Sequence, residues 1–297
     1  MVISIPATSA NLGAGFDSLG LALSLYNRCT IKPSRVMSIQ IRGEGANNPK
    51  LYRDNVFVKI FYEHYRKCGG NKKDQFRFQF DNQIPVSRGL GSSSAVIVGA
   101  VSAAYFMTQK AFIPDDVLFH ALKYEHHPDN ITPACVGGFT VSAIAGKHVC
   151  FLKTPIPSDL RAVVVVPTRS ISTAYSRQSL PKRYAQKDVV FNLSRASLLT
   201  AAFFSQNWNL LREASKDKMH QNMRMQQLPT LFDVQRTALK EGALMSTLSG
   251  SGSSFFNLCA YDDAPRIHKR LEAQFPSFQI LCLEFDNQGV QKQNGMD

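Results

Sequence analysis

The chain has 297 residues, 44% of them hydrophobic and 19% charged, which is typical of a soluble globular protein with one large or two medium domains. The longest apolar run, residues 95–107, is too short to span a bilayer, and no signal peptide is apparent, so no membrane partner is expected. The net charge of +12 is carried by single basic residues without a Lys/Arg-rich run, so a cleft for an anionic small molecule explains it as well as a nucleic acid does.

Alternating apolar and polar residues predict short strands in the N-terminal half. This pattern occurs at residues 2–6, 37–42 and 76–80. The first strand leads into a glycine-rich stretch, residues 7–17, that carries Asn11 and Asp17 among small side chains. A helix is expected directly after Asn55.

Residues 85–107 join a glycine loop to a helix. The sequence P-V-S-R-G-L-G-S-S-S-A places Gly89 and Gly91 before three serines and a run of small and apolar residues. Glycines let the backbone approach a ligand, and the free N–H groups at a helix N-terminus attract anions. Serine hydroxyls add donors, or a ligand for phosphate-bound magnesium. We therefore expect a phosphate site, although a simple turn with Ser92 as N-cap is the alternative and neither a Walker A loop nor G-x-G-x-x-G is present.

Polar residues crowd the end of the next predicted helix, which begins near Pro114. The sequence there is Y-E-H-H-P-D-N, residues 124–130. Adjacent histidines can bind a metal, but H-E-x-x-H spacing is absent, so a helix-end cluster is favoured over zinc. Strands are expected at residues 139–142 and 149–152, and the prolines at 155 and 157 place a domain boundary near residue 156.

The C-terminal half interleaves further strands and helices. Residues 162–166 and 278–285 predict strands, and helices are expected over 189–214, over 231–241 and from Pro265. A third glycine-serine loop, L-S-G-S-G-S-S-F-F, spans residues 248–256, and residues 286–297 have the composition of a polar tail. The pattern is that of an α+β sandwich. Six cysteines without C-x-x-C pairs argue against a zinc site or a disulfide framework and favour a reducing cytoplasm.

The three glycine-serine stretches resemble the three motifs of the GHMP kinases, a superfamily that includes galactokinase and the homoserine, mevalonate and phosphomevalonate kinases. Residues 85–95 look like the central phosphate motif, and residues 248–256 like the C-terminal loop, with Ser253-Ser254 where many members have Pro-Thr. P-A-T-S-A-N-L-G-A-G-F-D and H-P-D-N-I-T-P-A-C-V-G-G resemble the homoserine kinase branch. T-A-Y-S-R and D-K-M-H-Q-N-M-R extend the similarity over nearly the whole chain.

This resemblance implies the α+β GHMP kinase fold, with a ribosomal-S5-like N-terminal domain over residues 1–156 and a ferredoxin-like C-terminal domain over residues 157–297. The active site would lie between them. ATP, Mg²⁺ and L-homoserine are the implied ligands, a homodimer in the cytoplasm is the implied assembly, and no nucleic acid is expected. The product would be O-phospho-L-homoserine, in threonine biosynthesis.

The resemblance also assigns residues. The implied ATP-binding positions are Asn55, Val56, Pro85, Arg88, Gly89, Leu90, Gly91, Ser92, Ser93 and Ser94. Ser92 and Glu125 would hold magnesium, although His126 stands where many members have Gly. The implied homoserine positions are Asn11, Asp17, Asp129, Asn130, Thr173, Arg177 and Arg224. An amino acid needs a carboxylate for its ammonium and guanidinium for its carboxylate, which Asp17 and the two arginines can supply.

Phosphoryl transfer passes through a loose transition state, so positioning and charge neutralisation supply most of the catalysis. Asp129 is the carboxylate to test as a general base. Asn130, however, stands where mevalonate-kinase-like members have their base, so a mechanism without a strong base stays open.

Three other functions remain open at this point. A sister GHMP kinase would share the phosphate loop, but the two arginines with Asp17 favour an amino acid over mevalonate or a sugar. A non-catalytic binding module would show eroded motifs, whereas all three are intact here. Nucleic-acid binding would use the basic segment between residues 161 and 224, which has 11 Lys/Arg against three acidic residues.

Overall fold

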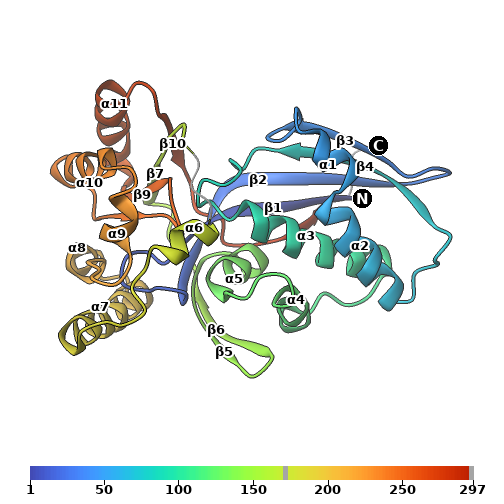
Figure 1. The fold of residues 1–297 in the computed structure, drawn as a ribbon, viewed down its shortest axis with the longest axis horizontal. Coiled ribbons are helices and arrows are strands. Elements are labelled where there is room, and N and C mark those ends of the chain that lie inside the picture. The colour runs from blue at the N-terminus through green and yellow to red at the C-terminus, as the bar shows by residue number, and fades with distance from the viewer. Residues whose placement is uncertain (170–172, 294–297) are drawn as a thin grey trace.

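The computed structural model describes residues 1–169 and 173–293, without the side chains of residues 173–175. Figure 1 shows two halves side by side, each built from a sheet with helices on it. In this view the long strands of the first half run behind and above α2 (Val56–Lys67) and α3 (Ser92–Met107), and the second half lies against their end.

The first sheet has seven strands in the described residues, in the order β11-β1-β2-β4-β3, with β5 beside β2 and β6 beside β5. Strand β2 is long enough to pair with β1 along one edge and with both β5 and β4 along the other. Only β3 and β4 run parallel within the described pairs. The strands are β1 (Val2–Ala10), β2 (Leu19–Ser34), β3 (Ser38–Gly43), β4 (Gln75–Asn82), β5 (Phe139–Ala145), β6 (His148–Thr154) and β11 (Gln291–Gln293).

Helix α3 is the buried centre of the first half. Its residues between Ser94 and Tyr105 are nearly all buried, because small and apolar side chains occur all round the helix rather than on one face. Helix α2 begins at the predicted place, where the Asn55 side chain accepts a hydrogen bond from the Val58 N–H. The helices of this half are α1 (Pro49–Arg53), α2 (Val56–Lys67), α3 (Ser92–Met107), α4 (Pro114–Ala121) and α5 (Pro128–Val136).

The second sheet has the order β10-β7-β9-β8, all antiparallel, which is the strand order of a ferredoxin-like β-α-β-β-α-β unit. Alternate residues of β7 enter two different cores: Val164 belongs to the core shared with the first half, and Val163 to the core under α10 and α11. The strands are β7 (Leu160–Val166), β8 (Met245–Leu248), β9 (Phe255–Ala260) and β10 (Gln279–Leu283). The helices are α6 (Thr173–Gln178), α7 (Gln186–Ser205), α8 (Leu211–Ala214), α9 (Gln221–Met225), α10 (Thr230–Lys240) and α11 (Ala264–Gln274), with 3-10 turns at Trp208–Leu210 and Tyr261–Asp263.

The end of the chain differs from the predicted polar tail. Asp286 accepts hydrogen bonds from the Tyr26 hydroxyl and the Gly289 N–H, Val290 is buried, and β11 pairs with β1. The prediction is wrong for residues 286–293, because a short segment with one apolar residue shows no strand period and is held by partners far away in the sequence. These residues lie with the first sheet, and the predicted boundary near residue 156 stays a prediction.

The polar cluster at residues 124–130 also differs from the predicted helix end. Residues 128–136 form a separate helix, α5, so Asp129 and Asn130 lie in its first turn. Pro128 at the first position fits a helix start, and Pro133 lies inside the helix. Within residues 1–169 and 173–293, no helix is long and apolar enough to cross a membrane.

Candidate active site

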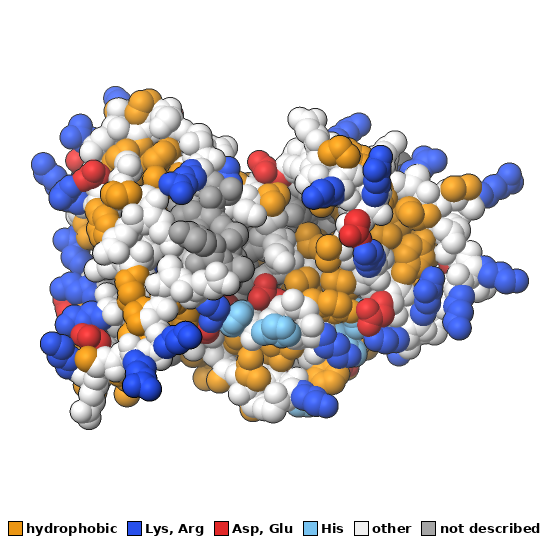
Figure 2. Space-filling model, in the orientation of Figure 1, with side chains coloured by type: hydrophobic (Ala, Val, Ile, Leu, Met, Phe, Trp, Pro, Cys, Tyr) orange, Lys and Arg blue, Asp and Glu red, His pale blue; other side chains and the backbone are white. Residues whose placement is uncertain are grey.

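A cleft of about 340 Å³ lies where the three glycine-serine loops meet. In Figure 2 the surface is hollowed between the two halves, with acidic and histidine side chains at the lower rim of the hollow. Every predicted site residue except Thr173 lines this cleft. Thr173 is the first residue of α6, and its side chain lies outside the described part of the chain.

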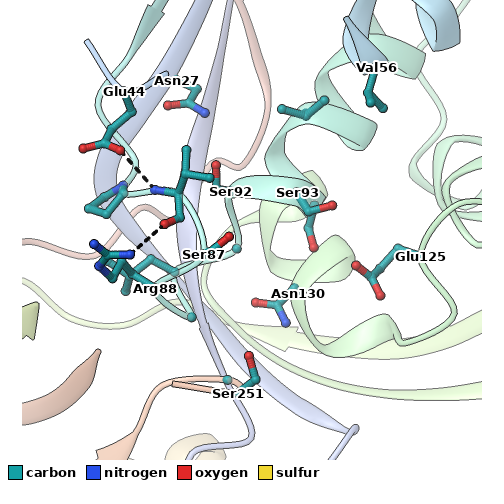
Figure 3. Close-up of a pocket in the computed structure, with 18 of the residues that line it drawn as sticks. Asn27, Glu44, Val56, Ser87, Arg88, Ser92, Ser93, Glu125, Asn130 and Ser251 are labelled. Carbon is teal, nitrogen blue, oxygen red and sulfur yellow. Dashed lines mark hydrogen bonds between the residues drawn. The ribbon is translucent and has the colours of Figure 1, made fainter. Parts of the chain in front are cut away.

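The predicted phosphate loop ends at the N-terminus of α3. Gly91 is the N-cap residue with φ of 68°, and no described side chain caps the helix there. A Cβ at Gly91 would lie 1.9 Å from Thr8 Oγ1, so only glycine fits. Ser92 and Ser93 begin the helix at the cleft wall, and Figure 3 shows Glu125 and Asn130 facing this helix start. The arrangement provides N–H groups, hydroxyls and the positive end of the helix dipole to an anion.

Hydrogen bonds to backbone carbonyls hold the three loops together. The Thr8 N–H donates to the Leu90 carbonyl (3.2 Å), and the Gly250 N–H donates to the Ala10 carbonyl (3.0 Å). The Ser249 hydroxyl donates to the Gly89 carbonyl (2.7 Å). The phosphate loop is therefore fixed by both other loops before any ligand binds.

Arg88 points away from the expected phosphate position. Its Nε donates to the Pro167 carbonyl (2.9 Å) and its Nη2 to the Thr168 carbonyl (2.6 Å), just after β7. Figure 3 shows its guanidinium turned from Ser93 and Glu125 toward the side of the loop. The Arg88 backbone belongs to the loop as predicted, but its side chain ties the loop to the second half.

The end of the cleft beside α2 is largely apolar. Val56 is 51% exposed on the cleft wall, and Ile41, Phe80 and Val86 are among its neighbours in the lining. Asn55 reaches the same wall, but its side chain is bonded to the backbone of Leu51 and Val58. A flat heterocycle fits such a surface, because apolar contact supplies most of its binding.

Opposite charges gather at the other end. Arg177 forms a bidentate ion pair with Asp17, and hydrogen bonding to this carboxylate raises the pKa of Arg177. Arg224 is buried, with its Nη1 bonded to the Gly250 carbonyl (3.1 Å), and burial together with Arg177 lowers its pKa to about 10. Asn11 also lines the cleft, but its amide is bonded to the Gly250 carbonyl and the Asp17 N–H.

Asp129 lies between the two ends and is 3% exposed. Burial, with Asp17 nearby, raises the pKa of Asp129 to about 7, so its carboxyl can accept a proton at neutral pH. Asn130 Oδ1 accepts the Thr8 hydroxyl proton (2.7 Å), which leaves Asn130 Nδ2 facing the Asp129 carboxyl (3.5 Å).

Two family domains match this chain: the GHMP kinases N terminal domain at residues 55–138 and the GHMP kinases C terminal domain at residues 199–277. A homoserine kinase of Wolinella succinogenes is 64% identical over 98% of this chain and 99% of its own length. A homoserine kinase of Nitratiruptor sp. is 60% identical, with the same coverage of both chains. The crystal structure of homoserine kinase from Cytophaga hutchinsonii superposes with a TM-score of 0.87 at 26% identity, covering 98% of this chain and 96% of that one.

The chain belongs to the homoserine kinase family of the GHMP kinases. The predicted family and the predicted GHMP kinase fold are confirmed. The roles of individual site residues are not tested by these comparisons and stay predictions.

Sequence reasoning missed two residues that line the cleft, His127 and Glu44, and one that packs against its arginines, Phe16. His127 Nδ1 lies 3.3 Å from Glu125 Oε1, and this contact raises the pKa of His127. Glu44 Oε2 accepts the Val86 N–H at the rim of the phosphate loop. Phe16 lies 5.2 Å from the guanidinium carbons of both Arg177 and Arg224, measured to its ring centroid. Phe16 and His127 stand inside two family motifs, which was a usable signal, whereas Glu44 had none.

Proposed function

We propose that the protein transfers the γ-phosphoryl group of ATP to the side-chain hydroxyl of L-homoserine, giving O-phospho-L-homoserine for threonine biosynthesis. The family carries the enzyme class, an ATP-dependent small-molecule kinase. The lining of the cleft supports an amino acid as the substrate class. The middle of the cleft holds the N-terminus of α3, which can bind an anion. One end holds the Asp17–Arg177 ion pair beside the buried Arg224.

In this proposal ATP lies along the cleft from α2 to α3. The apolar wall with Val56 receives the adenine, and the backbone of residues 88–94 surrounds the phosphates. Because no side chain of the described residues caps the first turn of α3, its N–H groups are placed to bind phosphate oxygens. The Asn55 side chain is engaged as a helix cap, so its contribution is to shape the adenine wall.

Ser92 and Glu125 would hold Mg²⁺. Both offer oxygen, the ligand that Mg²⁺ prefers, and one carboxylate with a hydroxyl is enough because phosphates and water complete the shell. Figure 3 shows the Glu125 carboxylate directed into the cleft toward the start of α3. When bound, the ion neutralises the negative charge that is shared by the β- and γ-phosphates.

Homoserine would bind at the charged end with its ammonium on Asp17 and its carboxylate on Arg177 and Arg224. Asn11 holds the Asp17 backbone, so it acts on the ammonium site through Asp17. Thr173, at the start of the helix that carries Arg177, is proposed as a further contact. The hydroxyl would then reach Asp129 and Asn130, which lie between this end and α3.

Asp129 and Asn130 are proposed to orient the acceptor hydroxyl. Because the pKa of Asp129 is about 7, its carboxylate can take the proton of the acceptor hydroxyl during phosphoryl transfer. Asn130 would hold that hydroxyl in position for the transfer. Asp129 is buried beside Asp17 and Glu125, so accepting a proton also relieves repulsion among three carboxylates.

A substrate panel tests the proposal. Purified protein with ATP and Mg²⁺ would be assayed for ADP release with L-homoserine, mevalonate and galactose, and the product identified by ³¹P NMR. We expect L-homoserine to be the preferred acceptor and its O-phosphate the product. Preference for mevalonate or a sugar would contradict the acceptor assignment while keeping the kinase class.

The proposal also includes the oligomeric state and the cellular location. A homodimer is supported by the outer face of α7, where Val190 and Leu193 are 57% and 66% exposed and Phe204 is 40% exposed. Sedimentation equilibrium of the wild type and Leu193→Glu tests it, and a monomeric wild type would contradict it. Cytoplasmic location is supported by six free cysteine thiols.

A further inference from the structure

His220 connects the first glycine loop to Arg224. The histidine is 1% exposed and is the residue before α9. Its Nε2 lies 2.8 Å from the Gly13 carbonyl oxygen, and its Nδ1 lies 3.3 Å from Arg224 Nη1. A carbonyl needs a donor and a guanidinium needs an acceptor, so a neutral imidazole with its proton on Nε2 satisfies both contacts.

Asp217 fixes the backbone on which His220 stands. Its carboxylate accepts the N–H groups of His220 (2.8 Å) and Gln221 (2.7 Å), and also the Asn192 side-chain amide (2.6 Å) from α7. His220 caps the start of α9 and Arg224 stands four residues later in the helix, and their side chains meet at 3.3 Å. The position and the orientation of the imidazole ring are therefore fixed by the surrounding backbone.

The guanidinium of Arg224 is confined on two sides. Its Cζ lies over the Phe16 ring, 5.2 Å from the centroid, and its Nη1 is shared between His220 and the Gly250 carbonyl. Arg224 Nε is buried and has no hydrogen-bond partner among the described residues. This Nε lies below the surface, and the bonds to His220 and Gly250 both use Nη1. The other terminal nitrogen, Nη2, is therefore the donor left for a ligand in the cleft that Arg224 lines.

We propose that His220 is a positioning residue for the acceptor: it holds Arg224 so that the unused N–H groups of the guanidinium meet the carboxylate of homoserine. This inference rests on the proposed carboxylate-binding role of Arg224. Burial lowers the pKa of His220, which keeps the imidazole neutral and able to accept from Arg224. The charged groups that face it are Asp217 and Arg224, together with Asp17 from the first loop.

Two conservative variants separate the two contacts of the imidazole. In His220→Asn the amide oxygen takes the place of Nδ1 and can still accept from Arg224. In His220→Gln the longer amide reaches the place of Nε2 and keeps the Gly13 contact alone. We expect His220→Gln to raise the KM for homoserine at least about tenfold and His220→Asn to raise it less than about threefold, with the KM for ATP within about twofold in both (tenfold being 1.4 kcal/mol).

A double mutant tests whether the effect passes through Arg224. Arg224→Ala alone should raise the KM for homoserine, and His220→Gln should add nothing in that background. His268→Leu is the control, because His268 also contacts a backbone carbonyl, that of Ile280, but lies on α11. It should leave the KM for homoserine unchanged.

The outcomes distinguish this inference from the function on which it rests. If Arg224→Ala raises the KM for homoserine but His220→Gln does not, the inference alone is wrong. If His220→Gln raises the KM for homoserine equally with and without Arg224, the role of His220 is purely structural and the inference is overturned. Equal rises in this KM for His220→Asn and His220→Gln would overturn it as well. If Arg224→Ala leaves the KM unchanged, the carboxylate assignment fails, and the inference fails with it.

Discussion

Asp17 and Arg177 form a bidentate ion pair at one end of the cleft, with Nη1 3.0 Å from Oδ2 and Nη2 2.7 Å from Oδ1. These are the two groups proposed to bind the ammonium and the carboxylate of the acceptor. A zwitterionic amino acid can replace both partners at once, so neither side chain is left with an unpaired charge. An acceptor with a carboxylate alone would draw Arg177 away and leave Asp17 unpaired. The pair therefore favours zwitterions.

Asp17→Asn should raise the KM for homoserine about 10- to 100-fold, because a hydrogen bond to a charged group contributes about 1.5–3 kcal/mol. Both side chains of the pair are roughly one third exposed, so the free energy of unfolding should change little. Initial rates with homoserine, with 4-hydroxybutyrate and with 3-aminopropan-1-ol measure the selectivity. The variant should discriminate less between homoserine and 4-hydroxybutyrate than the wild type does. Unchanged discrimination would contradict the ammonium assignment.

Ser92→Ala and Glu125→Gln should each lower kcat by a factor of about 100 or more, with a much smaller effect on the KM for homoserine. Both side chains are assigned to magnesium and the phosphates, where charge is stabilised chiefly in the transition state. Titration of activity with Mg²⁺ should show a raised requirement in Glu125→Gln. Glu284→Gln is the control, since Glu284 is exposed and pairs with Arg161. Near-normal turnover in both variants at saturating Mg²⁺ would remove the metal assignment.

Asp129 should control both the pH profile and the stability. A base must be deprotonated, so kcat/KM should fall as the pH drops below about 7, and Asp129→Asn should lose this limb together with most of the activity. Between the ordinary aspartate pKa and about 7 the folded state binds more protons than the unfolded state, so the free energy of unfolding falls as the pH rises. Asp129→Asn should therefore raise Tm at pH 8 and change it little near pH 4.

Calorimetry at pH 4, 6 and 8 measures the Tm of the wild type and of Asp129→Asn, and kinetics at the same pH values measure kcat/KM. A Tm gain at pH 8 together with lost activity would identify Asp129 as a functional group kept at a cost in stability. An Asp129→Asn variant that keeps the acid limb of the wild type would assign that limb to another group, and the orientation of the hydroxyl would then depend on Asn130.

Much of the site could be predicted because its loops are rich in glycine and serine. The loops at residues 7–17, 85–95 and 248–256 were all expected, and the structure brings them together. The continuous apolar run of residues 162–166 and the apolar run of α3 likewise placed buried elements correctly. These features depend on residues that are close together in the sequence, so a short stretch of sequence is enough to predict them.

What the sequence could not show depends on contacts between distant segments. His220 stands next to Gly13 only after folding, and β11 finds its partner in β1, almost the whole chain away. Asn11 and Asp17 adopt positive φ without being glycine, because the packing of the first loop and its own hydrogen bonds hold them there. The carbonyls that receive Arg88 belong to the backbone, so no residue type marks them.

The side chain of Arg88 and the motif in which it stands indicate different roles. The motif places it among the phosphate ligands, whereas its guanidinium donates to the carbonyls of Pro167 and Thr168. If it acts as a clamp, Arg88→Lys should fail to replace it, since an ammonium group lacks the planar fork that reaches both carbonyls.

We expect Arg88→Ala and Arg88→Lys to lower the free energy of unfolding by a similar amount, about 1–3 kcal/mol, and to raise the KM values for ATP and homoserine together. The loop that carries Arg88 is also bonded through Gly89 to Ser249, next to the Gly250 carbonyl that holds Arg224, so loosening it disturbs the acceptor end as well. Arg212→Ala is a matched control: Arg212 donates to the carbonyls of Leu239 and Ala243, away from the cleft, and its loss should lower Tm without changing either KM. Thermal unfolding and initial rates of the four proteins decide the matter. Normal activity of Arg88→Lys beside impaired Arg88→Ala would show that the charge on the phosphates matters and the clamp does not.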